Sequence, residues 1–155
     1  MMNENNKLIK KFAPSIITAF FNALGCLFLS LLVAVFAQRI HSYLFIIAAA
    51  LMLVTVYRFL KVAMIRYYLY EEMIVVKKGV FAVQYDSLEL YRVKDYRVSK
   101  TLIERVFGLM TVTLYTTDIS SPTLLLKGIE QSNVAQQIRG LVQVCRLKNR
   151  IFEIN

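Results

Sequence analysis

The chain has 155 residues, of which 57% are hydrophobic and 19% are charged, and its 19 basic and 10 acidic side chains give a formal charge of +9. Soluble domains typically contain about 45–50% apolar and about 25% charged residues, so this composition excludes a disordered basic tail and departs from an ordinary soluble domain. The length allows one soluble domain of about 90 residues after a hydrophobic N-terminal segment, which excludes a multi-domain enzyme.

The first predicted element is a membrane-spanning helix over residues 16–37. These 22 residues contain no charged side chain, and only Thr18, Asn22 and Ser30 are polar. A helix of this length crosses the roughly 30 Å hydrocarbon layer of a bilayer at about 1.5 Å per residue. A cleaved signal peptide is the alternative interpretation. Its apolar region usually holds only about 7–15 residues, so we expect this helix to be retained.

A second, shorter span is predicted over residues 43–61. Its uncharged stretch from Tyr43 to Tyr57 reaches only about 22 Å. The helix can continue through Arg58 and Lys61, because long basic side chains at a helix end lift their charges to the headgroups. Tyr43 and Tyr57 suit the aromatic belts at the two bilayer surfaces. A re-entrant or interfacial helix remains the alternative.

Together the spans predict an antiparallel helical hairpin, because only residues 38–42 separate them. Six basic residues lie beside the outer ends of the spans and only Arg39 lies in the turn, which favours cytoplasmic termini. We therefore expect a multi-pass inner-membrane protein with a cytoplasmic segment at 1–14 and a transmembrane hairpin at 15–65. The predicted membrane-interface residues are Lys7, Lys10, Lys11, Tyr43, Tyr57, Arg58 and Lys61.

Downstream of the hairpin, the sequence predicts a domain of short strands over residues 66–150, followed by a tail at 151–155. Short β-branched and aromatic runs broken by turn residues are typical of strands. The apolar alternation within residues 88–99 changes parity near Tyr91, which predicts a bulge or bend there. The other predicted elements are strands at 66–70, 73–77, 80–85, 110–116 and 123–126, a hairpin turn at Glu71-Glu72 and a short helical turn at 101–107.

An amphipathic helix is the last predicted element. Apolar residues recur at helical spacing while polar residues cover the opposite face. The apolar set is Val134, Ile138, Leu141, Val142 and Cys145. Antiparallel strands followed by one such helix predict an α+β fold, either a small barrel or two curved sheets, with the helix over an open end.

Three segments after the hairpin carry a resemblance to a known family. They are residues 67–79 (YYLYEEMIVVKKG), 88–98 (LELYRVKDYRV) and 105–112 (RVFGLMTV). With two apolar helices directly before them, they resemble the membrane-flanked bacterial pleckstrin-homology-like (PH-like) family of the YdbS type, over roughly residues 15–145. The resemblance implies a PH-like antiparallel β-barrel with a C-terminal helix on the cytoplasmic side. Such a fold does not fix a function.

Two lysines are candidate contacts for a lipid headgroup or a partner. Lys77 and Lys78 lie beside Gly79, and each basic group near an anionic bilayer adds about 1 kcal/mol of attraction. A solvated turn explains them equally well. Glu71 and Glu72 in the first hairpin turn would repel a phosphate, so no headgroup site is expected there.

A denser basic cluster is the second candidate contact region. Its members are Arg92, Lys94, Arg97, Lys100 and Arg105. Acidic residues at 89, 95 and 104 are interleaved with them and offset their field, so we expect no nucleic acid. A polar sheet face that contacts a second protein chain is the favoured interpretation.

No motif for catalysis or metal binding is visible in the sequence, which has one histidine and two cysteines. We expect two free thiols, no cofactor and no enzymatic activity. The favoured function is a membrane-anchored interaction module that binds membrane lipids and assembles with itself or other membrane proteins, in envelope maintenance or stress resistance. The alternative is a module that senses anionic lipid headgroups at the inner membrane surface.

Overall fold

The computed structural model describes residues 7–37, 41–118, 121–131 and 133–148. The chain divides into two compact units. One unit is Ser15–Met64, and the other combines Met1–Pro14 with Ile65–Asn155.

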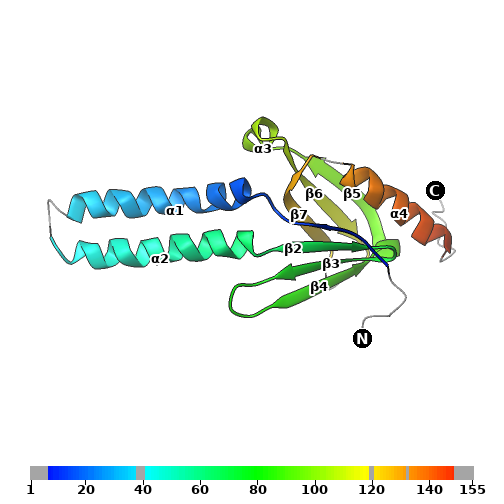
Figure 1. The fold of residues 1–155 in the computed structure, drawn as a ribbon, viewed down its shortest axis with the longest axis horizontal. Helices are drawn as coiled ribbons and strands as arrows, with labels where there is room; N and C mark the ends of the chain where they lie inside the picture. Colours follow the sequence, from blue (N-terminus) through cyan, green and yellow to red (C-terminus); the bar gives the residue numbers. More distant parts are fainter. Residues whose placement is uncertain (1–6, 38–40, 119–120, 132, 149–155) are drawn as a thin grey trace. The chain divides into compact units, whose positions relative to one another are not determined.

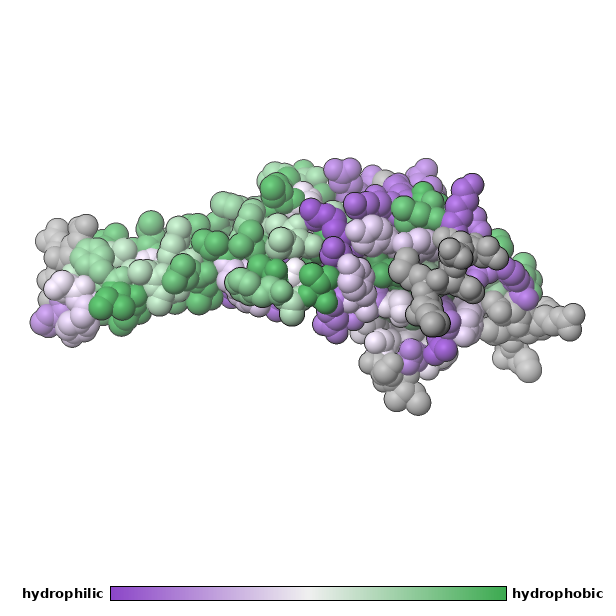
Figure 2. Space-filling view, turned by 60° about the horizontal axis from the view of Figure 1, so that its bottom comes forward, coloured by the Kyte–Doolittle hydropathy of each residue, from purple (hydrophilic) through white to green (hydrophobic). Residues whose placement is uncertain are grey.

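The first unit is a pair of helices, α1 (Ile16–Ala37) and α2 (Leu44–Ala63). Both predicted helices are confirmed, and α2 differs from its predicted bounds by one residue at its start and two at its end. Small side chains lie between the helices, including the buried Ala23 and Ala48. The buried hydroxyl groups of Ser30 and Thr55 donate to backbone carbonyl groups of their own helices. Large apolar side chains cover the outer surface of the pair (Figure 2).

Sheet one of the second unit has the order β1-β2-β3-β4 with antiparallel neighbours (Figure 1). Its strands are β1 (Leu8–Phe12), β2 (Arg66–Tyr70), β3 (Met73–Lys78) and β4 (Gln84–Glu89). Residues 1–14 were predicted to be a segment separate from the domain, whereas residues 8–12 form β1, an edge strand of this sheet. Phe12 pairs with Tyr67, and their ring centroids lie 5.2 Å apart.

A strand predicted at residues 80–85 is wrong at its start, because residues 79–83 form a loop and β4 begins at Gln84. Gly79 has a φ of +119°, a conformation that side chains with a Cβ rarely adopt. A Cβ at this position would lie 1.8 Å from the carbonyl oxygen of Ala82. The β-branched pattern favoured a strand that starts directly after Gly79, but this close turn moves the start of the strand to Gln84.

Sheet two has the order β5-β6-β7. Its strands are β5 (Val93–Ser99), β6 (Leu109–Thr116) and β7 (Thr123–Glu130). The predicted bend near Tyr91 is confirmed as a 3-10 turn, η1 (Leu90–Arg92), and the predicted helical turn as α3 (Leu102–Val106). The prediction that β7 ends before Gly128 is wrong. Gly128 has a φ of +58° at a register shift, so it forms a bulge and the strand continues to Glu130.

The barrel that the family resemblance implies is not closed, because no ladder joins the two sheets among the strands that the structure describes. The alternative predicted from the strand pattern, two sheets, is the arrangement observed. The chain passes from one sheet to the other through η1, and the sheets face each other across a shared core. The predicted C-terminal helix is α4 (Val134–Lys148), which adds Val134, Ile138 and Cys145 to that core. Apolar alternation predicts which face of a strand is buried, but it does not predict which strand edges pair.

Candidate functional site

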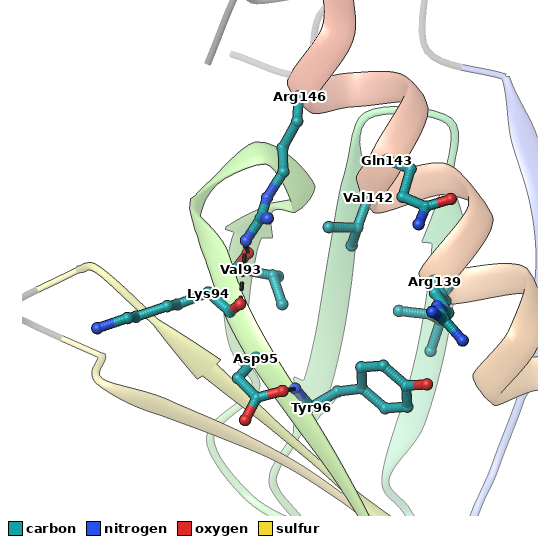
Figure 3. A pocket seen from close by; sticks show the side chains of 9 residues that line it. Val93, Lys94, Asp95, Tyr96, Arg139, Val142, Gln143 and Arg146 are labelled. Carbon is teal, nitrogen blue, oxygen red and sulfur yellow. Dashed lines mark hydrogen bonds between the residues drawn. The ribbon is translucent and has the colours of Figure 1, made fainter. Parts of the chain in front are cut away.

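A groove lies between β5 and α4 in the second unit, and we call it the β5–α4 groove (Figure 3). It has a volume of about 180 Å³. The lining residues are Val93, Lys94, Asp95 and Tyr96 from β5 and Ile138, Arg139, Val142, Gln143 and Arg146 from α4.

The β5 wall takes its shape from a register shift between Val93 and Asp95 in the pairing with β6. An irregularity of this kind changes the direction in which side chains point. Val93 is buried, the side chain of Lys94 points away from α4, and the ring of Tyr96 extends into the region below Arg139 (Figure 3). Lys94 therefore contributes its backbone to the groove.

Backbone groups of β5 point away from β6 and toward the groove. Arg146 donates from its guanidinium group to the carbonyl oxygens of Val93 and Lys94, the latter at 3.0 Å. The backbone N–H of Tyr96 donates to the carboxylate of Asp95 at 2.7 Å. Since alternate residues of an antiparallel edge strand direct their backbone groups outward, Val98 continues this row of outward groups.

The α4 wall is fixed by bonds near its C-terminal end. The Cys145 thiol donates to the carbonyl oxygen of Glu71 at 3.2 Å, and Lys148 forms an ion pair with Glu72. Burial raises the pKa of the Cys145 thiol, and the charge of Glu72 raises it further. The predicted acidic turn therefore anchors α4. Cys26 and Cys145 are both free thiols, as predicted.

Charge in the groove is mostly basic. Arg139 makes no hydrogen bond or ion pair with any other described residue, while the groove's single carboxylate, Asp95, already accepts the N–H of Tyr96. The walls between these groups are apolar, formed by Val93, Ile138 and Val142. This arrangement can hold a short segment that combines an apolar side chain with a carboxylate.

The predicted basic cluster is spread along β5 and beyond both of its ends. Arg92 on η1 pairs with Glu89 at 2.8 Å and with Asp118 at 3.6 Å. The guanidinium group of Arg97 lies 5.8 Å from the ring centroid of Tyr115. Lys94, Lys100 and Arg105 are exposed.

The other predicted lipid contacts, Lys77 and Lys78, lie at the end of β3. The ammonium group of Lys77 lies 5.6 Å from the ring centroid of Tyr85, and Lys78 forms an ion pair with Asp86 at 2.7 Å. The loop that follows exposes Phe81 to 92%. One lysine of the pair is therefore offset by a carboxylate, and an apolar loop accompanies both.

The predicted membrane-interface residues fall in both units. Lys7 precedes β1, and Lys10 and Lys11 lie on it, with the ammonium group of Lys11 5.4 Å from the ring centroid of Tyr68. Tyr43 precedes α2, which carries Tyr57, Arg58 and Lys61. Arg58 donates to the sulfur of Cys26 on α1 at 3.1 Å.

Comparison with known families identifies the family of this chain. The family described as bacterial PH domain matches residues 16–148, a range that begins at α1 and ends at the last residue of α4. The chain belongs to the bacterial PH domain family. A search of curated proteins and a search of solved structures found no match. The resemblance inferred from the sequence is confirmed. The matched range of this bacterial PH domain includes both apolar helices.

Two other ionisable groups of this bacterial PH domain have shifted pKa values and structural partners. Glu104 caps α3: its carboxylate accepts the backbone N–H of Thr101 and the hydroxyl group of Thr111. The buried Tyr67 hydroxyl group accepts the backbone N–H of Lys127 at 3.1 Å. Among the described residues, no three His, Cys, Asp or Glu side chains gather as metal ligands would.

Sequence reasoning missed the groove in this bacterial PH domain. Arg139 and Arg146 lie on the face of the last helix that was predicted to be polar, and Tyr96 lies within the segment of the predicted basic cluster. A spacing of seven residues between the arginines puts both on one helix face, which was the available signal. The other wall of the groove, the outer edge of β5, depends on the strand order and leaves no mark in the sequence.

Proposed function

We propose that this bacterial PH domain is a membrane-anchored, non-enzymatic interaction module that assembles with itself or with other membrane proteins at the cytoplasmic face of the inner membrane. We propose envelope maintenance or stress resistance as the role of such an assembly. The observation that carries this proposal is the apolar outer surface of the helical pair, α1 and α2.

Burial separates a membrane hairpin from the core of a soluble protein. Only 17% of the most apolar 18-residue window of α1 is buried, and only 11% of that of α2. Leu53 and Ile46, near the middle and the start of α2, are 73% and 74% exposed. Apolar surface favours removal from water by roughly 25 cal/mol per Å², so a continuous surface of this kind is stable in lipid and costly in water.

The hydrogen bonds of the ionisable groups with shifted pKa values support a binding role over catalysis. Catalytic acids and bases usually have shifted pKa values and face a cleft. Here Glu104 caps a helix, Tyr67 joins the two sheets, and Cys145 bonds to a turn. The shifted groups therefore serve the fold.

Crosslinking in native membranes tests the assembly. The full chain is crosslinked in bacterial membranes, extracted gently and measured by native mass spectrometry. We expect a discrete homo-oligomer or a complex with another membrane protein. Detection of the monomer alone, with and without crosslinker, would contradict the assembly.

A lipid-sensing function is the second candidate, and the β3–β4 loop favours it. Phe81 and Val83 are exposed at 92% and 52% next to Lys77 and Lys78. Apolar side chains beside basic ones suit an anionic bilayer surface. The ion pair between Lys78 and Asp86 lowers the net charge, which makes this candidate weaker than protein assembly.

A further inference from the structure

The outer edge of β5 is an edge of sheet two, whose order is β5-β6-β7. An edge strand presents backbone N–H and C=O groups that can pair with another chain. Side chains occupy the first part of this edge, where Arg146 caps the carbonyl groups of Val93 and Lys94 and Asp95 caps the N–H of Tyr96. Val98 is not among the residues that line the groove, and the alternation along β5 directs its backbone groups outward.

We propose that the β5–α4 groove binds an extended segment of a partner protein, which adds to β5 as a further strand and places a carboxylate against Arg139. This inference rests on the proposed interaction function and names its partner class. The added strand covers Tyr96 and Val98 and sets one apolar side chain against Val142.

Groove size favours a polypeptide segment over a small molecule. Small-molecule sites usually have volumes of about 300–1,000 Å³, whereas this groove has about 180 Å³. That volume suits a single side chain. A peptide supplies one side chain to the groove and obtains further affinity from backbone pairing along the strand edge, as in β-strand addition.

An exposed apolar face on β5 extends the contact beyond the groove. Tyr96 and Val98 pair with Leu114 and Val112, so they lie on the core-facing side of sheet two. They are nevertheless 36% and 40% exposed. An added strand with apolar residues at alternate positions would cover both.

Charge selects an acidic residue in the segment. Arg139 has no ion-pair partner among the described residues, and a guanidinium group can bind a carboxylate through two parallel hydrogen bonds. Asp95 opposes this binding in two ways, because it adds the groove's one negative charge and occupies the N–H of Tyr96. Asp95 therefore acts as a competitor that an incoming strand displaces.

The test uses the full chain in lipid nanodiscs and labelled synthetic peptides of nine residues. Valine and threonine alternate in each peptide, and glutamate occupies each position in turn; a matched set carries lysine instead. We expect at least one glutamate peptide to bind, with its lysine counterpart weaker by about tenfold or more. Two further peptides carry methyl groups on the backbone nitrogens of either the odd or the even positions. One of them should not bind, and the other should bind as before.

Three variants locate the site. Arg139→Glu should weaken the glutamate peptide by about tenfold or more. Lys127→Glu makes the same charge change on β7, at the opposite edge of sheet two, and should leave binding unchanged. Asp95→Ala should strengthen binding, a result that a purely structural role of Asp95 would not give.

The inference is overturned if no glutamate peptide binds, or if amide methylation has no effect. A chain that binds anionic vesicles but none of the peptides would instead support the lipid-sensing function. Flotation of the same chain with vesicles, measured in parallel, distinguishes failure of the groove proposal from failure of the proposed membrane anchor. A chain that floats but binds no peptide refutes only the groove, whereas a chain that does not float refutes the membrane anchor.

Discussion

Tyr67 joins the two sheets through the hydrogen bond that its hydroxyl group accepts from the backbone N–H of Lys127 at 3.1 Å. Burial raises the pKa of Tyr67 to about 12, and the bond from Lys127 lowers it by less. The folded state therefore favours the neutral phenol. This single residue makes the packing of the two sheets depend on pH.

The raised pKa of Tyr67 predicts a loss of stability in alkali. The contribution is complete below pH 10, the ordinary pKa, and is lost as pH rises through about 12, a decrease of about 2–3 kcal/mol. Tyr67→Phe should remove this dependence and cost about 1–3 kcal/mol at neutral pH, because the N–H of Lys127 loses its acceptor. Near-UV circular dichroism of the full chain in detergent measures both, since seven of the nine tyrosines lie in the second unit. A wild-type chain with flat stability up to pH 12 would contradict the prediction.

Glu104 acts in the opposite pH range. Burial raises the pKa of its carboxyl group, but bonds from Thr111, Thr101 and Gly128 together outweigh burial and lower it. Its contribution is present above the ordinary pKa of 4.5 and is lost as pH falls through the lower folded value. Glu104→Ala should lower the unfolding free energy at neutral pH by about 1–3 kcal/mol. Glu130→Ala, at an exposed position, is the control and should change it by less than about 0.5 kcal/mol. Equal losses would argue against the cap.

At the scale of elements, the sequence predicted those whose signal is local. An uncharged run of 22 residues predicts a helix wherever it lies, and the parity change near Tyr91 marks a bend. β1 was missed because its residues, Leu8 to Phe12, include two lysines and lie far in sequence from their partner β2. The β5–α4 groove depends on contacts between distant segments, so it could not be predicted. For the same reason, the sequence left a small barrel and two separate sheets open as alternatives.

Gly79 fixes the loop that sets the start of β4. Gly79→Ala should lower the unfolding free energy by about 1–3 kcal/mol from backbone strain alone, and by more where Ala82 cannot move. Gly140→Ala is the matched control, because nothing lies within 4 Å of its added Cβ and it sits inside α4. That change should raise stability by about 0.5–1 kcal/mol. Thermal unfolding of both variants measures these changes. Equal shifts of the unfolding temperature would contradict the loop geometry.

The β3–β4 loop offers a test of the lipid candidate. The chain contains no tryptophan, so Phe81→Trp places a single fluorophore at the loop. If the loop contacts an anionic bilayer, its emission should shift to shorter wavelength when anionic lipid replaces neutral lipid in the vesicles. Val144→Trp on α4, exposed at 61%, is the control. An unchanged Phe81→Trp spectrum in both lipids would remove the second candidate function.

At the scale of the whole molecule, the account depends on the helical pair. Membership of the bacterial PH domain family covers α1 and α2 together with the second unit, and their outward apolar surface has no cover among the described residues. Under the proposed function, a bilayer supplies that cover. The proposals for the groove, the β3–β4 loop and the assembly all assume this anchor.

Depth-dependent quenching in vesicles tests the anchor most directly. Leu53→Trp places the fluorophore near the middle of α2, at a side chain that is 73% exposed. If α2 spans the bilayer, emission should be blue-shifted, and lipids brominated near the bilayer centre should quench it more strongly than lipids brominated near the headgroups. Neither lipid should quench Val144→Trp. Emission from Leu53→Trp at the wavelength typical of water, insensitive to both lipids, would contradict the span.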